Sequence, residues 1–156
     1  MNLKEKTDEL REIKLKAWNK ATKKMYEVIK IDFYNEKVGY LFADPITQGE
    51  AIGYFKFSDI DLMEYTEFKD KNGVDIYEGD ILEFTVFDCY AGDYQYRGFL
   101  EVDKYGKFIK TDLNNDEFTK VFDFVDVVVN DDELTVIGNI YENPELLEEE
   151  EWERGY

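Results

Sequence analysis

Short apolar runs separated by turn residues about every ten positions most constrain the fold of this chain. Aromatic and β-branched side chains dominate these runs, which favours strands over helices. We expect strands over residues 13–17, 25–33, 38–43, 50–57, 80–88, 94–103, 107–111, 118–129 and 134–141, with 57–65 as a loop that leads into a further strand. So many short strands predict a mainly β chain that contains a small barrel.

The end of the chain carries the signals of a short helix. Asn143 is a favourable N-cap residue, and Pro144 suits the first helical position. Glutamates at 148–151 would face solvent. The side chains expected to face the body of the protein are Leu146, Leu147 and Trp152.

Two acidic segments lie between strand patterns. Asp70 to Gly73 contains an Asn-Gly pair, which is typical of a type I′ hairpin turn because both central residues need a positive φ. The same stretch resembles part of a calcium-binding loop, but its glycine is fourth and position twelve is Ile81 rather than glutamate. We therefore interpret it as a turn, and we interpret 131–133 as a solvated loop.

Charge is spread unevenly along the chain. The net charge is −18, yet residues 1–30 carry nine Lys/Arg and five Asp/Glu, whereas residues 31–156 carry ten and 32. An acidic body repels phosphate backbones, so we do not expect it to bind nucleic acid. The basic first segment could contact nucleic acid or an acidic partner, or its lysines could simply solvate a strand and a turn.

The residues that most enzymes use are scarce. The chain has no histidine, which removes the commonest acid–base group and metal ligand, and Cys89 is the only cysteine. Nucleotide-binding glycine motifs are absent from the sequence. We expect a protein that is not an enzyme and needs no cofactor or metal, although abundant carboxylates leave a paired-carboxylate hydrolase as an alternative.

No apolar run in the sequence is long enough to span a bilayer, and the first residues do not form a signal peptide. These two observations predict a soluble cytoplasmic protein that does not associate with a membrane.

Aromatic side chains at strand ends are the best candidates for a binding surface, because small barrels bind peptides or nucleic acid through aromatic grooves. Tyr77 and Tyr141 are preferred, since each lies beside glycine, asparagine or acidic residues. Packing between neighbouring strands is the competing explanation for each ring. The full candidate set is Trp18, Tyr65, Tyr77, Asp80, Asn139 and Tyr141.

Two sequence blocks carry a resemblance to a known family. They are YTEFKDKNGVDIYEGDI at 65–81 and VIGNIYENPELL at 136–147, and REIKLKAWN at 11–19 is similar to the family's opening. Together they resemble the YopX family of phage and prophage proteins. Where this family usually has Gly-Leu, the chain has Glu67-Phe68.

The resemblance implies an N-terminal β-rich part over residues 1–62. It implies an SH3-like barrel over 63–156, with a C-terminal acidic helix. It also implies a phage or prophage origin in a bacterial host cell, and it supplies no catalytic residues to transfer.

These observations lead to three functional hypotheses. The first is a non-enzymatic phage accessory protein that binds a host or phage protein. The second is an acidic decoy that mimics DNA and occupies a DNA-binding enzyme of the host. The third is a nucleic-acid binder that uses the basic N-terminal segment. An exposed edge strand would also allow a homo-oligomer.

Overall fold

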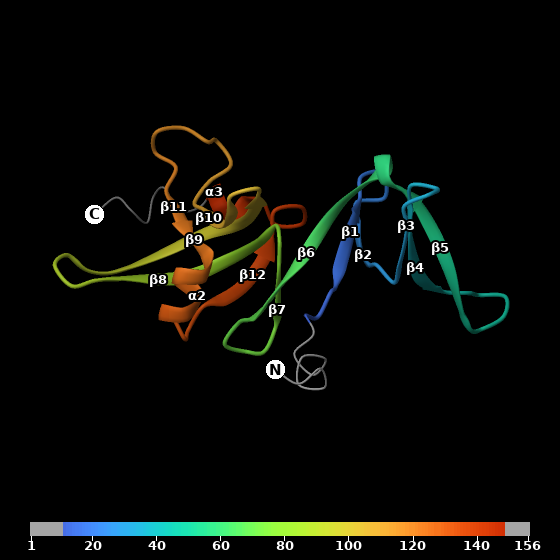
Figure 1. Cartoon of the computed structure of the whole chain (residues 1–156), viewed down its shortest axis with the longest axis horizontal. Helices are drawn as coiled ribbons and strands as arrows, with labels where there is room; N and C mark the ends of the chain where they lie inside the picture. Colours follow the sequence, from blue (N-terminus) through green and yellow to red (C-terminus); the bar gives the residue numbers. More distant parts are fainter. Residues whose placement is uncertain (1–10, 149–156) are drawn as a thin grey trace, which may run out of the picture. The chain divides into compact units, whose positions relative to one another are not determined.

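The computed structural model describes residues 11–148, which form two compact units that meet between Glu67 and Phe68 (Figure 1). Both units are built almost entirely from antiparallel strands, and the helices are short. The predicted mainly β fold with a β-rich first part is confirmed, and the part predicted as an SH3-like small barrel contains a curled sheet that forms a half-barrel. One strand, β6 (Ile60–Lys69), contains both the predicted division at 62/63 and the division at 67/68.

The first unit contains two sheets. Its elements are β1 (Leu15–Asn19), β2 (Lys24–Glu27), β3 (Lys30–Asp32), β4 (Lys37–Ala43), β5 (Glu50–Lys56), the 3₁₀ turn η1 (Phe57–Asp59) and β6 (Ile60–Lys69). One sheet has the order β3-β4-β5, and the other has the order β2-β1-β6. The end of β6 continues into the second unit, to which its next neighbour in the strand order, β7 (Asp75–Tyr77), belongs. The two sheets bury a small core that is centred on Ala17, Val38 and Ile60.

Two expectations for this unit are wrong in detail. Residues 25–33 are not one strand, because the chain leaves β2 after Glu27 and enters the other sheet as β3. Val28 and Ile31 both pack against the core while Ile29 is exposed, so the segment cannot keep a strict alternation. The expected loop over 57–65 is mostly strand, since β6 begins at Ile60.

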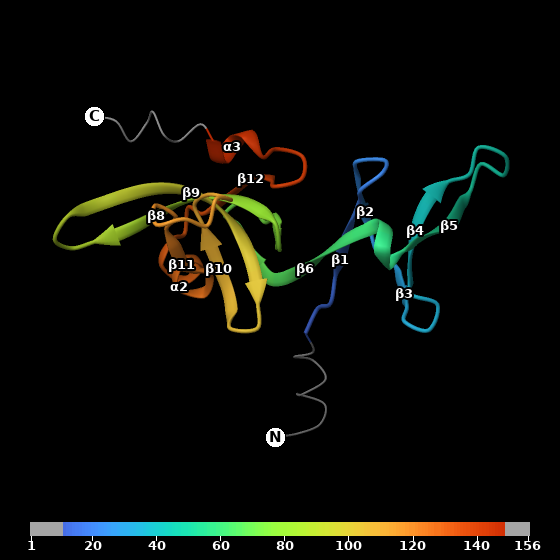
Figure 2. The same ribbon diagram turned by 90° about the horizontal axis from the view of Figure 1, so that it is seen from above.

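The second unit is a five-stranded sheet of order β11-β10-β9-β8-β12, and every adjacent pair is antiparallel. Figure 2 shows the curl of this sheet. Its elements after β7 are β8 (Asp80–Asp88), β9 (Gly92–Asp103), β10 (Gly106–Lys110), β11 (Val121–Asp123), α2 (Phe124–Asn130), β12 (Thr135–Asn139) and α3 (Glu145–Glu148).

The core of the second unit is larger than that of the first. Eight buried apolar residues form one cluster, namely Ile76, Leu82, Phe84, Leu100, Ile109, Phe124, Val127 and Leu134. Leu147 of α3 packs against Ile81 and Phe99 in a second cluster, as expected for the C-terminal helix. The remaining glutamates of the predicted helix, at 149–151, and Trp152 lie outside the described residues.

The strand expected over 118–129 is wrong in extent, because only Val121–Asp123 is a strand and the second half of the range belongs to the helix α2. Asp123 caps this helix, since its side chain accepts a hydrogen bond from the Asp126 N–H. Phe124 and Val127 are three positions apart and both buried, which is helical spacing. A local cap and two well-placed contacts thus override the strand preference of a valine-rich segment.

The turn at 70–73 is a turn, but it is not type I′, because only Gly73 takes a positive φ and Asn72 does not. Asp70 organises it instead. Its Oδ1 accepts hydrogen bonds from the N–H groups of Asn72 (2.8 Å) and Val74 (2.9 Å), and its Oδ2 accepts one from Val136 (3.0 Å). This buried carboxylate therefore joins the turn to β12.

Asp131 corrects the expectation that 131–133 is a solvated loop, since it is only 4% exposed. Its Oδ2 accepts a hydrogen bond from the Thr85 N–H (2.7 Å), and its Oδ1 accepts one from the Glu133 N–H (3.0 Å). The side chain covers the edge of β8 where β12 no longer pairs with it.

Glu67 marks the end of the first unit with an unusual backbone, because its φ is +71° within strand β6. Positive φ is strained for a residue with a Cβ and free of strain for glycine. This conformation accounts for the glycine that the YopX resemblance places at this position.

Candidate functional site

Two of the six candidate residues, Trp18 and Tyr65, lie on neighbouring strands of the first unit. Trp18 of β1 is half-buried and pairs with Asp61 of β6. Tyr65 is only 5% exposed, and the Lys14 Nζ lies 5.1 Å from the centre of its ring. Tyr65 therefore contributes packing rather than open surface.

The other four candidates lie together in the second unit, around the first residue of β8 and the last residue of β12. Asp80 pairs with Asn139 across the two strands. The Asp80 Oδ2 accepts a hydrogen bond from the Tyr77 N–H (2.8 Å). The Asn139 Oδ1 accepts hydrogen bonds from the N–H groups of Tyr141 (3.0 Å) and Glu142 (2.8 Å).

These residues stabilise the local fold, because the side chains of Asp80 and Asn139 accept hydrogen bonds from backbone N–H groups of the adjoining turns. Tyr77 is buried, at 6% exposed, while Tyr141 is half-buried. The burial of Tyr77 disagrees with its choice as a surface ring. A binding role for the six residues stays a prediction, and the bonds of Asp80 and Asn139 explain why they belong to the family's two sequence blocks.

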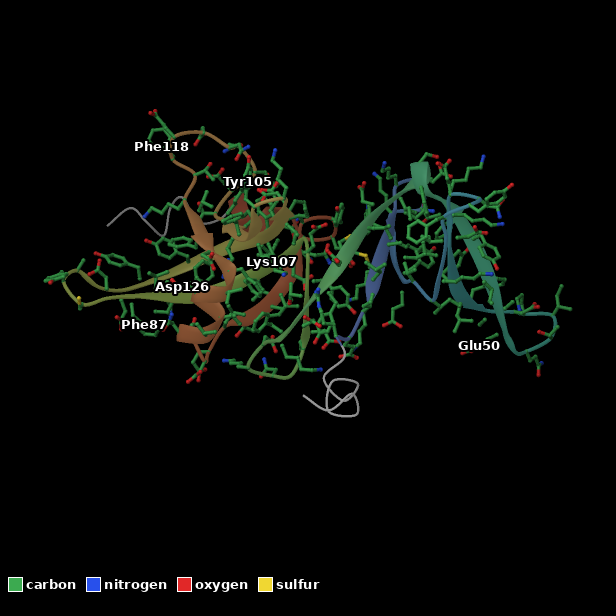
Figure 3. The ribbon with its side chains drawn as sticks, in the orientation of Figure 1. Glu50, Phe87, Tyr105, Lys107, Phe118 and Asp126 are labelled. Atoms are coloured by element: carbon green, nitrogen blue, oxygen red, sulfur yellow. The ribbon has the colours of Figure 1, made fainter. Side chains whose placement is uncertain are left out.

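The second unit also has two open clefts that share Thr85 and Phe87 of β8. Half of the residues that line the larger cleft, of about 650 Å³, are charged, and most of these side chains form ion pairs or hydrogen bonds within the protein. Lys71 pairs with Glu133 (3.3 Å), and Asp131 holds two backbone N–H groups. The smaller, of about 270 Å³, lies between Phe87 and Asp126 of α2, which are both labelled in Figure 3.

No metal or nucleophile site emerges from the part of the chain that the structure describes. Within residues 11–148, no group of three or more His, Cys, Asp or Glu is placed to hold a metal ion. Cys89 is exposed in the turn that follows β8. Within the same residues, no helix is long and apolar enough to cross a membrane.

The surface that stands out is the outward face of the β3-β4-β5 sheet in the first unit. Along β5, exposed and half-buried residues alternate strictly, so one set of side chains points away from the core. On that face Leu41 is 46% exposed, Ile52 49% and Tyr54 42%. Leu41 and Ile52 are cross-strand partners, and Tyr54 lies opposite Gly39. Together they form a contiguous apolar patch.

Lysines frame this patch. The Nζ atoms of Lys37 and Lys30 lie 4.5 and 5.7 Å from the centre of the Tyr54 ring, within reach of cation–π attraction. Lys56 is the cross-strand partner of Lys37 and lies on the same face. Asp32 is the acidic neighbour of Lys37, and hydrogen bonds from the side chain and backbone of Asn35 hold its pKa below the usual range.

We call the outward side chains of Lys30, Lys37, Leu41, Ile52, Tyr54 and Lys56 the basic apolar face. The sequence predicts strands over 38–43 and 50–57 but does not indicate that their outward side chains form one surface. The sequence signal that could have identified this face is that each of the three neighbouring strands carries a lysine, which is an unusual concentration of positive charge in so acidic a chain. The units differ accordingly, with a net charge of −2 over residues 1–67 and −16 over residues 68–156.

The opposite face of the same sheet is aromatic and is packed around Tyr40 and Phe55, whereas Phe42 near its end is 42% exposed. Tyr40 stacks on Phe55 with ring centres 4.2 Å apart, and Tyr26 of β2 lies 4.8 Å from Tyr40. A Cβ at Gly53 would come within 2.5 Å of the Tyr40 ring, so the glycine makes room for this stack. The packed face holds the sheet in place and leaves the basic apolar face outward.

Comparison with known proteins agrees with this architecture. The crystal structure of protein EF1440 from Enterococcus faecalis is similar to 88% of this chain and 99% of that chain, with a TM-score of 0.56 and 28% sequence identity. No curated protein matches the chain. The family model of the YopX protein matches residues 14–148, which is most of the chain. The resemblance found in the two sequence blocks is thereby confirmed, and the chain belongs to the YopX protein family.

Proposed function

We propose that this chain is a non-enzymatic protein-binding module of a phage or prophage, and that it acts in the bacterial cytoplasm. The observation that carries the proposal is the basic apolar face. An apolar patch that is framed by polar residues and built on a rigid sheet is typical of a protein interaction site. A host or phage protein is the expected partner.

Charge complementarity indicates the chemistry of that partner. The three lysines of the basic apolar face surround Tyr54 and outnumber the two carboxylates on the same side of the sheet, Asp32 and Glu50, so the matching surface carries acidic side chains next to an apolar one. Tyr54 and Leu41 supply apolar contact area. The lysines fix the position of the partner on the face and raise the rate of association. The partner is therefore a protein segment in which acidic residues flank apolar residues.

The test compares two double variants in a nuclease-treated pull-down from host lysate, followed by mass spectrometry. The face variant combines Lys37→Glu and Leu41→Ser, which both lie on the central strand β4. The matched control combines Lys104→Glu and Leu113→Ser, which are exposed in the second unit. Both carry the same chemical changes, so only their location differs.

We expect a protein that the wild type and the control retain and the face variant loses. Its retention should fall with salt, because the lysines contribute attraction. Equal retention by all three proteins, or a loss confined to the control, would exclude the basic apolar face as the binding site. Circular dichroism of both variants verifies that each remains folded.

A DNA-mimicking decoy is the second candidate, and the charge of the second unit favours it. Residues 68–156 carry eight Lys/Arg and 24 Asp/Glu, which is dense enough to attract a DNA-binding enzyme. In this case the retained proteins would be DNA-binding enzymes, added duplex DNA would release them, and the face variant would retain them as well as the wild type does. Failure of DNA to release any retained protein would eliminate this candidate.

A further inference from the structure

The edge strand β5 is complementary to a second copy of itself. The β3-β4-β5 sheet ends at β5, and within residues 11–148 no further strand pairs with it (Figure 1). It contains seven residues, no proline and no bulge in its pairing with β4. An edge of this kind presents unpaired backbone groups to solvent and is a template for strand addition.

The hydrogen bonds at the two ends of the β4-β5 hairpin show which groups face outward. Asp44 N–H donates to the Gly49 carbonyl (2.8 Å), and Phe57 N–H donates to the Glu36 carbonyl (2.9 Å). In an antiparallel pair the bonded residues alternate, so the odd-numbered residues of β5 bond to β4. The N–H and C=O groups of the even-numbered residues, 50, 52, 54 and 56, therefore point to the open edge.

We propose that the protein forms a two-fold symmetric dimer in which β5 of one copy pairs antiparallel with β5 of the other, centred on Gly53. In this register Glu50 faces Lys56 of the second copy, and Ile52 faces its Tyr54. By symmetry each of these pairs forms twice. All four even-numbered residues then meet even-numbered partners, so every outward backbone group of β5 gains a hydrogen bond.

Charge and shape favour this register over its neighbours. Lys37 and Lys56 are adjacent like charges within one copy, and Glu50 of the second copy would lie next to Lys56 and compensate them. Figure 3 labels Glu50 at the beginning of β5. A shift by two residues keeps the backbone pattern but removes both Glu–Lys pairs and leaves outward groups unpaired. Ile52 with Tyr54 is in turn a favourable aromatic and β-branched cross-strand pair.

The dimer would join the two sheets into one, so that the basic apolar faces of both copies become continuous. Leu41, Ile52 and the second copy's Tyr54 would form one apolar row across the junction. This inference uses the strand edge rather than the face, and it stands independently of the proposed partner. The Lys37→Glu and Leu41→Ser changes on β4 leave the pairing groups of β5 intact, so the two proposals can fail separately.

The experiment is sedimentation equilibrium of the full chain with two charge reversals. Lys56→Glu places two like-charged pairs across the junction, and we expect it to raise the dimer dissociation constant by about tenfold or more. Adding Glu50→Lys restores both pairs in the opposite sense and should return the dissociation constant to near the wild-type value. Lys24→Glu, on the edge strand β2, makes the same charge change elsewhere and should have no effect.

A backbone variant separates strand pairing from side-chain contact. Ile52→Pro removes an outward N–H without removing a bond to β4, and proline is tolerated at such edge positions. We expect a variant that is folded by circular dichroism and monomeric by sedimentation equilibrium. A wild type that stays monomeric at all concentrations would overturn the proposal. A dimer that withstands both Lys56→Glu and Ile52→Pro, or one that the double charge reversal does not restore, would overturn it as well.

Discussion

The two units of this protein are built from the same kind of strand but distribute their apolar side chains differently. The second unit buries eight apolar residues in one cluster, whereas the central cluster of the first has three. The first unit instead leaves Leu41, Ile52 and Tyr54 outward beside lysines. Larger cores give greater stability, and exposed apolar faces give binding. We infer that the second unit is the more stable and that the first is specialised for contact.

The largest expected effect tests the core of the second unit. Phe84→Ala removes a ring that is 2% exposed and contacts the Tyr96 and Phe122 rings. We expect it to lower the free energy of unfolding by about 3–5 kcal/mol in urea denaturation. Phe118→Ala removes the same ring from an exposed position in the same unit, and it should change stability by less than about 0.5 kcal/mol. Similar losses for both would remove the distinction between core and surface.

The next effect tests the buried carboxylate that joins two segments of the second unit. Asp70→Ala deprives the N–H groups of Asn72, Val74 and Val136 of their acceptor. We expect a loss of about 2–3 kcal/mol in the free energy of unfolding, because buried donors without partners are costly. Asp132→Ala removes an exposed carboxylate nearby and serves as the control. An equally small change in both variants would show that Asp70 is dispensable.

A smaller, opposite effect is expected at the division between the units. Glu67→Gly relieves the strain of a φ of +71° but also removes the ion pair between Glu67 and Arg11 (3.1 Å). That pair is exposed and contributes little. We expect a net gain of about 0.5–1 kcal/mol, measured as a higher urea midpoint. Glu64→Gly, in the same strand, should destabilise instead, and a loss of stability at both positions would contradict the account of residue 67.

The smallest effect concerns a turn that both units contain, in which an aspartate side chain accepts hydrogen bonds from N–H groups two or three residues later in the chain. Asp88 in the second unit accepts hydrogen bonds from the N–H groups of Tyr90 and Ala91, and these hold its pKa below the usual range. Asp32 in the first has a pKa that is lowered by bonds from Asn35. A lowered pKa contributes stability above the unfolded-state value of about 3.9, which is lost as pH falls through the folded-state value.

NMR titration of the carboxyl carbons measures both values directly. We expect the pKa of Asp32 and of Asp88 to lie below the ordinary value for an aspartate. Asp88→Asn should abolish its share of the pH dependence, so the variant and the wild type should converge in stability as pH falls through the folded-state pKa of Asp88. An ordinary pKa at either position would mean that the turn bonds are not maintained in solution.

The sequence predicted strands best where local pattern and tertiary packing agree. The strand expected over 80–88 is β8 with the same bounds, because its inward residues pack in the core and turn residues flank it. The helix α2 was missed, since its valines favour strands and its cap at Asp123 is a single residue. The turn type at Asn72 was wrong, because the acceptor that shapes it, Asp70, also bonds Val136, 66 residues away in sequence.

The candidate site was harder to predict than the fold. Tyr77 lies beside turn residues in sequence and Tyr65 follows the acidic Glu64, yet both rings are buried by elements that sequence pattern cannot place around them. The basic apolar face joins side chains from three strands, and which face of β5 turns outward depends on the stack of Tyr40 and Phe55. The sequence predicted the strand over 50–57, but not which of its two faces turns towards solvent.

The most direct test of the central claim, that the first unit makes the contact, is site-specific photocrosslinking in the host cell. A photoreactive phenylalanine analogue is introduced at position 41 on the basic apolar face or at position 118 in the second unit, which are both exposed. We expect a discrete crosslinked protein from position 41 and none from position 118. Crosslinks from position 118 alone would contradict the account and assign binding to the acidic unit.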